Sequence, residues 1–179
     1  MASSVLQTSS KIYFGPFLVT PQVFHITPHS FALVNLKPLL PGHVLVSPRR
    51  VTPRFSDLTQ TEVTDLYLTV QRVGRMIERV YGATGLNIAM QDGIDAGQSV
   101  PHVHTHIIPR KAEDLEDRGG SDAIYGMLEG EEGNVGKHLR ESKGDRPKFP
   151  AVDDDTRKPR SDEEMAAEAQ KLGREMEVN

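Results

Sequence analysis

The sequence has 179 residues, of which 37% are hydrophobic, 26% charged and 6% aromatic. This length fits one domain with extensions better than two independent hydrophobic cores. A formal net charge of −4 excludes the broad basic surface with which proteins hold nucleic acid or anionic membranes, so we expect neither partner. The absence of cysteine excludes disulfides, thiolate metal ligands and a cysteine nucleophile. Histidine is therefore the side chain from which nucleophilic or soft-ligand chemistry is expected.

Residues 1–11 are rich in Ser and Thr and contain no apolar run of the kind that forms a signal peptide. No later stretch is apolar over the length that a bilayer requires. We therefore expect a cytoplasmic protein that can also reside in the nucleus. A mitochondrial destination is the alternative, because the N-terminus lacks acidic residues, although it also lacks the arginines of a transit peptide.

Short apolar runs alternate with turn residues in the first part of the chain. Four runs cover residues 17–19, 23–26, 31–34 and 43–46, with prolines and a glycine between them. Two later runs cover residues 86–90 and 102–108 and flank a turn-rich segment. This pattern predicts antiparallel strands.

One long helix is predicted between these two groups of strands. Thr59 and Glu62 have the spacing of a capping box, and apolar residues follow at helical intervals as far as Val80. Gly82 stands where a C-terminal cap is expected, so the helix is predicted from Gln60 to Tyr81. A sheet covered by one major helix indicates an α+β fold.

The composition changes after Pro109. Residues 113–160 are charged and rich in glycine, which predicts a mobile loop, interrupted by a small apolar island around Tyr125. Ser161 and Glu164 then repeat the capping-box spacing and predict a C-terminal helix that packs back on the domain. The predicted organisation is a flexible N-terminus over 1–12, a core over 13–112, the loop over 113–160 and a helix over 161–177.

Three histidines stand at alternate positions, as His102, His104 and His106. On a strand they would share one face, while Val103 and Thr105 would face the other side. With a reference pKa of ~6.5, each imidazole is mainly neutral near pH 7, and neutral imidazole is nucleophilic. The cluster therefore predicts a reactive face on one side of the sheet.

Three uses of this face remain open from the residues alone. In covalent catalysis the central His104 is the natural nucleophile, and the flanking imidazoles orient it and move protons. A metal site is the second use, but the outer histidines would lie ~13 Å apart on a strand, so a further ligand such as His43 would be needed. The third is a polar strand face exposed to water.

The segment from His102 to Ile108 resembles the motif of the histidine triad superfamily, in which histidines alternate with hydrophobic residues. Surrounding segments are similar to the fragile histidine triad branch, the diadenosine triphosphate hydrolases; they cover residues 30–35, 41–46, 90–93, 96–100 and 109–112. The resemblance runs from about Phe14 to Lys111 and returns from Arg160 to Ala169. It implies an α+β fold of the histidine triad type.

The resemblance also implies roles for the histidines. His104 would attack the α-phosphorus of a dinucleoside triphosphate, and water would then hydrolyse the nucleotidyl-histidine. His102 and His106 would support the nucleophile and contact the phosphates, and His43 would buttress the triad. The family further implies a homodimer and a divalent cation, Mg²⁺ or Mn²⁺, carried by the substrate polyphosphate, with no tightly bound structural metal.

Other positions match substrate contacts of the family, and they are Asn35, Gln91, Gly97, Gln98, Ser99 and Val100. A glycine-containing turn can aim backbone N–H groups and a hydroxyl at phosphate oxygens. Taken singly, Asn35 could cap a strand end, Gln91 could fix the next turn, and Gly97 could belong to an ordinary turn. The family's N-terminal contact to the nucleotide has no clear counterpart near Phe17.

The role of Tyr125, two alternative functions and the position of the long helix stay open. Tyr125 resembles a loop tyrosine of the family and would be a regulatory position. Another triad branch would act on nucleoside phosphoramidates or adenylated amines, and a slow-turnover, nucleotide-dependent signalling module would use the loop around Tyr125 as a partner surface. The helix over 60–81 could lie at the dimer interface or could cover only its own sheet.

Overall fold

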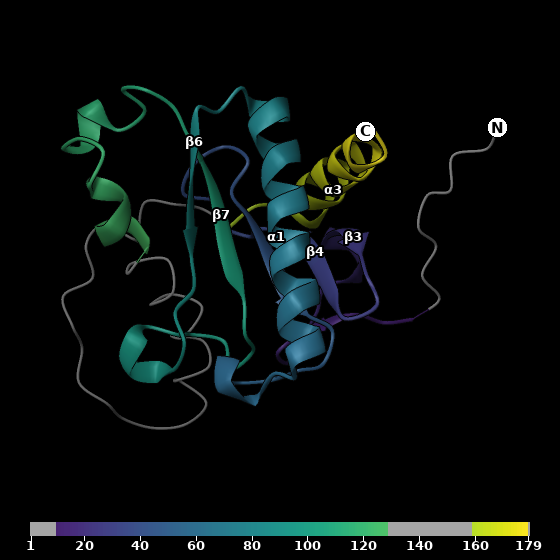
Figure 1. Ribbon diagram of the computed structural model, residues 1–179. Coiled ribbons are helices and arrows are strands. Elements are labelled where there is room, and N and C mark those ends of the chain that lie inside the picture. The colour runs from purple at the N-terminus through teal and green to yellow at the C-terminus, as the bar shows by residue number, and fades with distance from the viewer. Residues whose placement is uncertain (1–9, 129–158, 179) are drawn as a thin grey trace.

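The computed structural model describes residues 10–128 and 159–178 (Figure 1). A five-stranded antiparallel sheet has the order β3-β4-β5-β7-β6. The strands are β3 (Val23–Ile26), β4 (Ser30–Val34), β5 (Val44–Pro48), β6 (Gly85–Ala89) and β7 (Thr105–Arg110). A separate hairpin pairs β1 (Tyr13–Phe14) with β2 (Phe17–Leu18), and the helices are α1 (Gln60–Tyr81) and α3 (Asp162–Met176). The predicted α+β fold is therefore confirmed.

Both helices begin at the capping boxes that the sequence predicts. The Thr59 hydroxyl accepts from the Glu62 N–H and the Glu62 carboxylate accepts from the Thr59 N–H, so two N-terminal donors of α1 are satisfied. Gly82 ends α1 with a φ of 60° in the left-handed region. Ser161 and Glu164 make the same reciprocal pair at the start of α3. Neither α1 nor any other helix in the described residues has the length and apolar character needed to cross a membrane.

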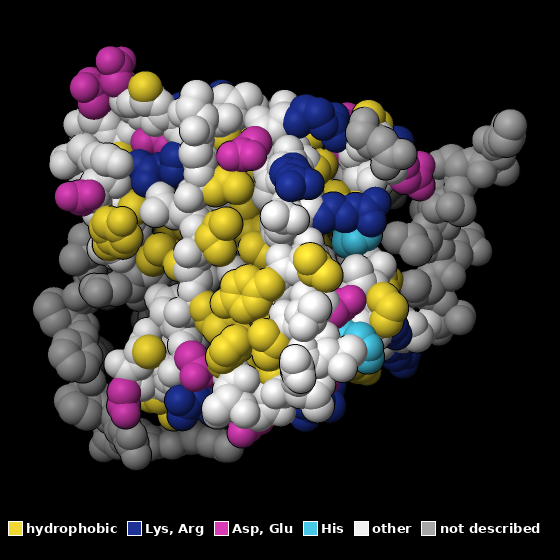
Figure 2. Space-filling view, viewed as in Figure 1, with side chains coloured by type: hydrophobic (Ala, Val, Ile, Leu, Met, Phe, Trp, Pro, Cys, Tyr) yellow, Lys and Arg dark blue, Asp and Glu magenta, His cyan; other side chains and the backbone are white. Residues whose placement is uncertain are grey.

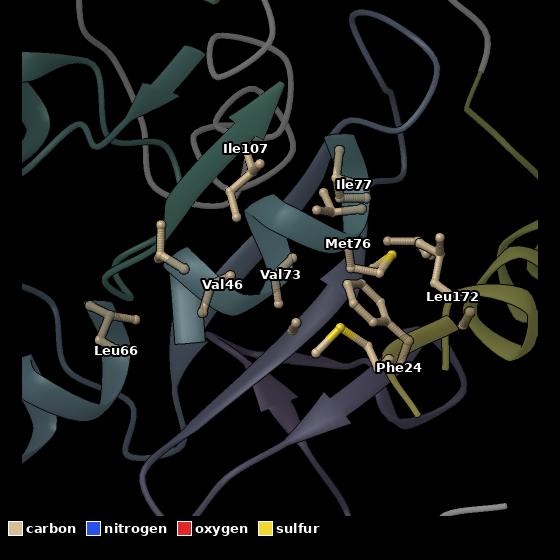
Figure 3. Packing of buried hydrophobic residues seen from close by; sticks show 14 of the residues in the cluster. Phe24, Val46, Leu66, Val73, Met76, Ile77, Ile107 and Leu172 are labelled. Atoms are coloured by element: carbon tan, nitrogen blue, oxygen red, sulfur yellow. The ribbon is translucent and has the colours of Figure 1, made fainter. Parts of the chain in front are cut away.

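The main core lies between the sheet and the two helices. Figure 3 shows side chains of the sheet, α1 and α3 pointing toward one another; the labelled ones are Phe24, Val46, Leu66, Val73, Met76, Ile77, Ile107 and Leu172. Leu172 of α3 is completely buried. α3 therefore contributes to the main core together with α1 and the sheet.

A second cluster covers the opposite face of the sheet. Strand alternation sends Phe31 and Leu33 of β4 into this cluster, whereas Ala32 and Val34 join the main core. The rest of the cluster comes from β5, the hairpin region and the loop before β7, as Leu45, Ile12, Phe14, Val19 and Val100. Ile12 is thus packed although the sequence pattern assigned it to the flexible N-terminus, of which residues 1–9 lie outside the described part of the chain.

Residues 113–128 pack on the domain, which differs from the mobile loop predicted from residue 113. Leu115, Ile124 and Leu128 are buried in a third cluster that also holds Ile108 of β7. The segment is also held by Arg110, which donates to Asp114 and to the Ser121 carbonyl. A composition average over a charged segment does not reveal such specific contacts. The remainder of the predicted loop, 129–158, lies outside the described residues.

Replacing Leu172 by Ala should lower the free energy of unfolding by about 2–5 kcal/mol, because a fully buried leucine leaves a cavity when it is truncated. Urea unfolding followed by circular dichroism measures this loss. The matched control is Leu18→Ala on β2, where half of the side chain is exposed. Equal losses in the two variants would contradict the packing of α3.

Candidate active site

The triad lies on the face of the sheet opposite the helices. His106 on β7 pairs with Leu45 of β5 and with Ala89 of β6, and Leu45 belongs to the second cluster. Val103 and Ile107 point the other way, into the main core under α1. On β7, His106 and Ile107 therefore lie on opposite faces of the sheet, as strand alternation predicts, and all three histidines are buried.

The strand is shorter than predicted. β7 begins at Thr105, so His102 and His104 precede it instead of lying on it. The backbone N–H of Val103 donates to the Thr52 carbonyl at 2.7 Å, and β5 ends at Pro48, which has no N–H for the ladder. The chain before Thr105 is thus held by single bonds to Thr52 and to Ser47 and Pro48 at the end of β5, and not by a strand ladder.

Backbone groups fix the tautomer of His102. Its Nδ1 accepts from the Gly15 N–H at 3.0 Å, and its Nε2 lies 2.8 Å from the Pro48 carbonyl. An N–H only donates and a carbonyl only accepts, so the proton is on Nε2 and the ring is neutral. Burial lowers the pKa of His102 to about 4, against a smaller opposing effect of the Pro48 bond. His102 is therefore a structural support that does not take up a proton near pH 7.

His104 has its proton assigned in the same way. Nδ1 lies 2.8 Å from the carbonyl oxygen of His102, so Nδ1 donates. In the neutral ring the lone pair is then on Nε2. The backbone carbonyl can also stabilise a positive charge that develops on the ring when Nε2 forms a bond to an electrophile.

His43 and His106 are joined by a hydrogen bond. The Leu39 N–H donates to His43 Nδ1 at 3.1 Å, so in the neutral ring the proton is on Nε2. This Nε2 lies 2.9 Å from His106 Nδ1, which accepts. The proton of neutral His106 is therefore on its Nε2. The ring centroids of His104 and His106 lie 5.1 Å apart. The nucleophilic ring of His104 is therefore next to the hydrogen-bond donor His106.

Asn35 closes this group at the end of β4. It is buried, and its amide oxygen accepts from the Lys37 N–H at 3.0 Å. Its amide nitrogen lies 3.3 Å from His43 Nε2; both nitrogens carry protons in this tautomer, so the amide packs against the ring without a hydrogen bond. The structure thus brings Asn35, His43 and the triad into one cluster. The turn-capping role of Asn35 that the sequence left open is also present, because the bond to Lys37 N–H closes the turn after β4.

Phe14 and Gly15 are site residues that the sequence analysis missed. The Phe14 ring stacks on His102 at 5.6 Å between centroids and contacts His104 edge-on at 5.1 Å. Gly15 has a φ of 55°, and a Cβ on it would lie 2.6 Å from Val100, so glycine is required where its N–H reaches His102. The Phe14-Gly15 pair in the first hairpin was the sequence signal for this contact, three residues before Phe17.

A three-histidine metal centre does not fit these contacts. Both ring nitrogens of His102 are bonded to the backbone, and Nδ1 of His43 is bonded to Leu39. In the described residues, no three side chains from His, Asp and Glu are grouped so that they could hold a metal ion. Metal binding by the triad would require these backbone bonds to break.

The loop before the triad is built on positive-φ glycines. Gly97 has a φ of 95°, and a Cβ there would lie 3.5 Å from the Gln91 amide nitrogen, so Gln91 and this loop are in contact. The Gln98 side chain accepts from the Gly93 N–H at 3.1 Å and donates to the Pro53 carbonyl at 2.8 Å. In this structure Gln98 therefore ties the loop to the segment after β5.

The remaining predicted positions differ in their surroundings. Ser99 is half-buried beside the loop glycines, whereas the side chain of Val100 is buried in the second cluster, so only its backbone could meet a ligand. Tyr125 is 59% exposed. Among the described residues no contact joins it to the triad, and a regulatory role for it stays a prediction.

The depressed pKa of His102 predicts a pH-dependent stability. Between pH 6.5 and about 4 the unfolded chain binds a proton at this position that the folded chain does not, so stability falls as pH falls through this window. From pH 7 to pH 5 the loss due to His102 should be about 2 kcal/mol. Urea unfolding at both pH values should show a smaller loss for His102→Gln than for the wild type. The exposed His29→Gln is the control, and an equal pH dependence in all three proteins would contradict the prediction.

Comparison with known proteins agrees with this geometry. A family model described as the HIT domain matches residues 19–113. The asymmetrical bis(5'-nucleosyl)-tetraphosphatase of Schizosaccharomyces pombe is 48% identical over 171 residues, which cover 90% of this chain and 92% of that protein. The bifunctional bis(5'-adenosyl)-triphosphatase/adenylylsulfatase FHIT of Arabidopsis thaliana is 51% identical over 133 residues, 74% of this chain and 72% of its own. The crystal structure of Plasmodium falciparum diadenosine triphosphate hydrolase in complex with cyclomarin A superposes with a TM-score of 0.59 at 34% identity, covering 78% of this chain and 90% of that one. The chain belongs to the histidine triad family, in its fragile histidine triad branch.

Proposed function

We propose that the protein hydrolyses dinucleoside triphosphates, splitting diadenosine triphosphate into AMP and ADP through a covalent nucleotidyl-histidine intermediate on His104. The observation that carries the proposal is the 2.8 Å bond from His104 Nδ1 to the His102 carbonyl, which leaves Nε2 as the nucleophilic nitrogen. Names of similar proteins give the substrate class, because the Arabidopsis and Plasmodium relatives are named for diadenosine triphosphate cleavage.

In the first step Nε2 of His104 attacks the α-phosphorus and forms a P–N bond. The bond from this phosphorus to the bridging oxygen breaks, and ADP leaves with the electron pair. The Nε2–H of His106 is the group that can hydrogen-bond the departing oxygen, because its Nδ1 already accepts from His43.

In the second step water attacks the phosphorus of the nucleotidyl-histidine and loses a proton to the solvent. The P–N bond breaks, its electron pair returns to Nε2 of His104, and AMP is released. The Nδ1–H of His104 continues to donate to the His102 carbonyl in both steps, so the ring regains its neutral tautomer. His102 and His43 are supports in this scheme, since their ring nitrogens are engaged with the backbone and with His106.

We assign the nucleotide contacts by combining the family match with position. Gln91, Gly97, Gln98 and Ser99 would contact the phosphates from the loop, and Val100 would contribute its backbone. Asn35 would contact the substrate from the other side of the triad. Gln98 would first have to exchange its bonds to Gly93 and Pro53 for bonds to phosphate.

A divalent cation, Mg²⁺ or Mn²⁺, would reach the site as part of the substrate. A polyphosphate binds such cations through its own oxygens, and they reduce the charge that repels an incoming nucleophile. The described residues contain no grouped metal ligands that would hold the cation in advance. Turnover should therefore fall on addition of EDTA while the melting temperature of the ligand-free protein does not change.

The named relatives differ in the group that is attached to the nucleoside monophosphate and leaves on cleavage. The relative from Schizosaccharomyces pombe is named for a tetraphosphate, and the Arabidopsis relative also for adenylyl sulfate. The same attack on an α-phosphorus serves all of these leaving groups. Comparing turnover of diadenosine triphosphate, diadenosine tetraphosphate, adenylyl sulfate and a nucleoside phosphoramidate would rank them and would test the alternative triad branch.

Replacing His104 by Asn should lower kcat on diadenosine triphosphate by about 10³-fold or more, the order found when a catalytic nucleophile is removed. Product formation is followed by chromatography of AMP and ADP. In alkali-quenched wild-type reactions, mass spectrometry should find a nucleotidyl group on the peptide that contains His104, and this group should be absent from the variant.

His29→Asn is the matched control, because this histidine is exposed and lies outside the site. Its kcat should equal that of the wild type. Wild-type turnover in His104→Asn would contradict the covalent route, and a wild type that releases no AMP and ADP would contradict the substrate assignment.

We also infer a homodimer formed through β6 and α1. β6 is an edge strand of the sheet, so one row of its backbone groups has no neighbouring strand within the described residues. Figure 2 shows hydrophobic side chains gathered on the face that carries α1 and β6. Tyr67 and Leu68 of α1 and Ile88 of β6 are exposed. A second copy of the chain would cover this surface.

Replacing Ile88 by Lys should halve the molar mass in solution, because a charge would be buried at the centre of this interface. Size-exclusion chromatography with light scattering measures the mass. Leu18→Lys on the separate hairpin is the control with equal exposure and should stay dimeric. A monomeric wild type would overturn the inference.

A further inference from the structure

Asn35 and His43 stand at the two ends of the segment that connects β4 to β5. This segment, residues 35–43, has no regular secondary structure, yet it carries His43, whose Nε2 donates to His106 Nδ1 at 2.9 Å. A connection of this kind holds a side chain accurately only if other elements fix its backbone. Both ends of the segment are in fact held by residues far away in the sequence.

Arg160, just before α3, holds the first end. Its backbone N–H donates to the Leu36 carbonyl at 3.1 Å. Its guanidinium donates through Nε at 3.0 Å and through a terminal nitrogen to the carbonyl of Asn35. The planar fork thus holds the peptide next to the side chain that contacts His43.

Tyr81, the last residue of α1, holds the second end. A Cβ placed on Gly42 would lie 2.7 Å from the Tyr81 ring, so the ring packs directly against the residue that precedes His43. The Tyr81 hydroxyl donates to one carboxylate oxygen of Glu168 at 2.7 Å. The other carboxylate oxygen of Glu168 accepts from Arg160.

Glu168 therefore links the two holding residues into one clamp, Tyr81–Glu168–Arg160. The side chains of Arg160 and Glu168 are only 21% and 18% exposed, which limits screening by water. Burial, and secondarily the bond to Glu168, raise the pKa of the Tyr81 hydroxyl, so it remains a donor at physiological pH. No member of the clamp touches the triad itself in the described contacts.

We propose that Arg160 is a positioning residue for the reaction, which acts through Asn35 by fixing its carbonyl and thereby the packing of its side-chain amide against the His43 ring. The inference rests on the proposed hydrolase function for its kinetic consequences. It assigns to α3 a role in orienting His106, in addition to covering the core.

Replacing Arg160 by Met should lower kcat/KM for diadenosine triphosphate by about tenfold to a hundredfold, since a displacement of about 1 Å in a catalytic group has effects of this size. Arg160→Lys should lose nearly as much, because one ammonium group cannot hold the Asn35 carbonyl and Glu168 with the geometry of a guanidinium. Loss in the lysine variant shows that the fork is needed in addition to the charge.

Arg79→Met is the matched control. Arg79 also bridges α1 and α3, through Glu175 at 2.6 Å, but it does not contact the 35–43 segment. Its kcat/KM should change less than twofold. If Arg160 only docked α3, the two variants would lose activity in proportion to their melting temperatures, and that result would overturn the proposal.

A double variant tests the route of action. In an Asn35→Ala background, Arg160→Met should cost less than threefold, because the side chain through which Arg160 acts is absent. A full tenfold or greater loss in that background would show that Arg160 acts independently of Asn35 and would overturn the proposal.

Imidazole ¹⁵N chemical shifts give a readout without turnover. Arg160→Met should shift the ring nitrogens of His43 and His106, and Arg79→Met should not. If the wild type fails to cleave any substrate while these shifts change as expected, the proposed function fails and the clamp stands. If the wild type is active and both the shifts and the activity of Arg160→Met are unchanged, the clamp fails and the function stands.

Discussion

The bond from the Leu39 N–H to His43 Nδ1 determines the protonation pattern on which the site depends. Because a backbone N–H can only donate, His43 must present its Nε2–H to His106, and His106 must in turn present its own Nε2–H toward its surroundings. The carbonyl of His102 has the complementary effect on His104, where it takes the Nδ1 proton and leaves the lone pair on Nε2. Two backbone groups thereby make one imidazole a donor and its neighbour a nucleophile.

This arrangement explains how so many imidazoles can be buried together. A cluster of imidazolium ions would be unstable in a buried site, because the charges would repel and burial opposes each of them. Backbone partners for His102 and His43 satisfy ring nitrogens without any charge. The sheet supplies the remaining constraint, since β7 is held between β5 and β6 and cannot shift its register without moving Ile107 out of the main core.

The helices contribute to the site from the opposite face of the sheet. α1 presents Tyr81, whose ring packs against Gly42 in the connection that carries Asn35 and His43, and α3 presents Glu168, which accepts from Tyr81 and from Arg160. The sequence from Arg160 to Ala169 therefore combines three tasks in one short stretch. Ser161 and Glu164 cap the helix, Met165 and Ala169 are buried in the core, and Arg160 and Glu168 hold the 35–43 segment.

Sequence alone determined the elements whose signals are local. Both capping boxes, the glycine that ends α1, the antiparallel strands and the separation of His106 from Ile107 follow from short-range periodicity, and the structure confirms them. The sequence also revealed the histidine triad and its family, because alternate residues of an extended chain lie on the same face whatever the rest of the fold is. The tertiary structure decided what depends on contacts between distant segments. It set the start of β7 at Thr105, the tautomers of the histidines, the packing of Phe14 on His102 and the contact of Arg160 with Asn35, since each of these bonds joins residues that only the folded chain brings together.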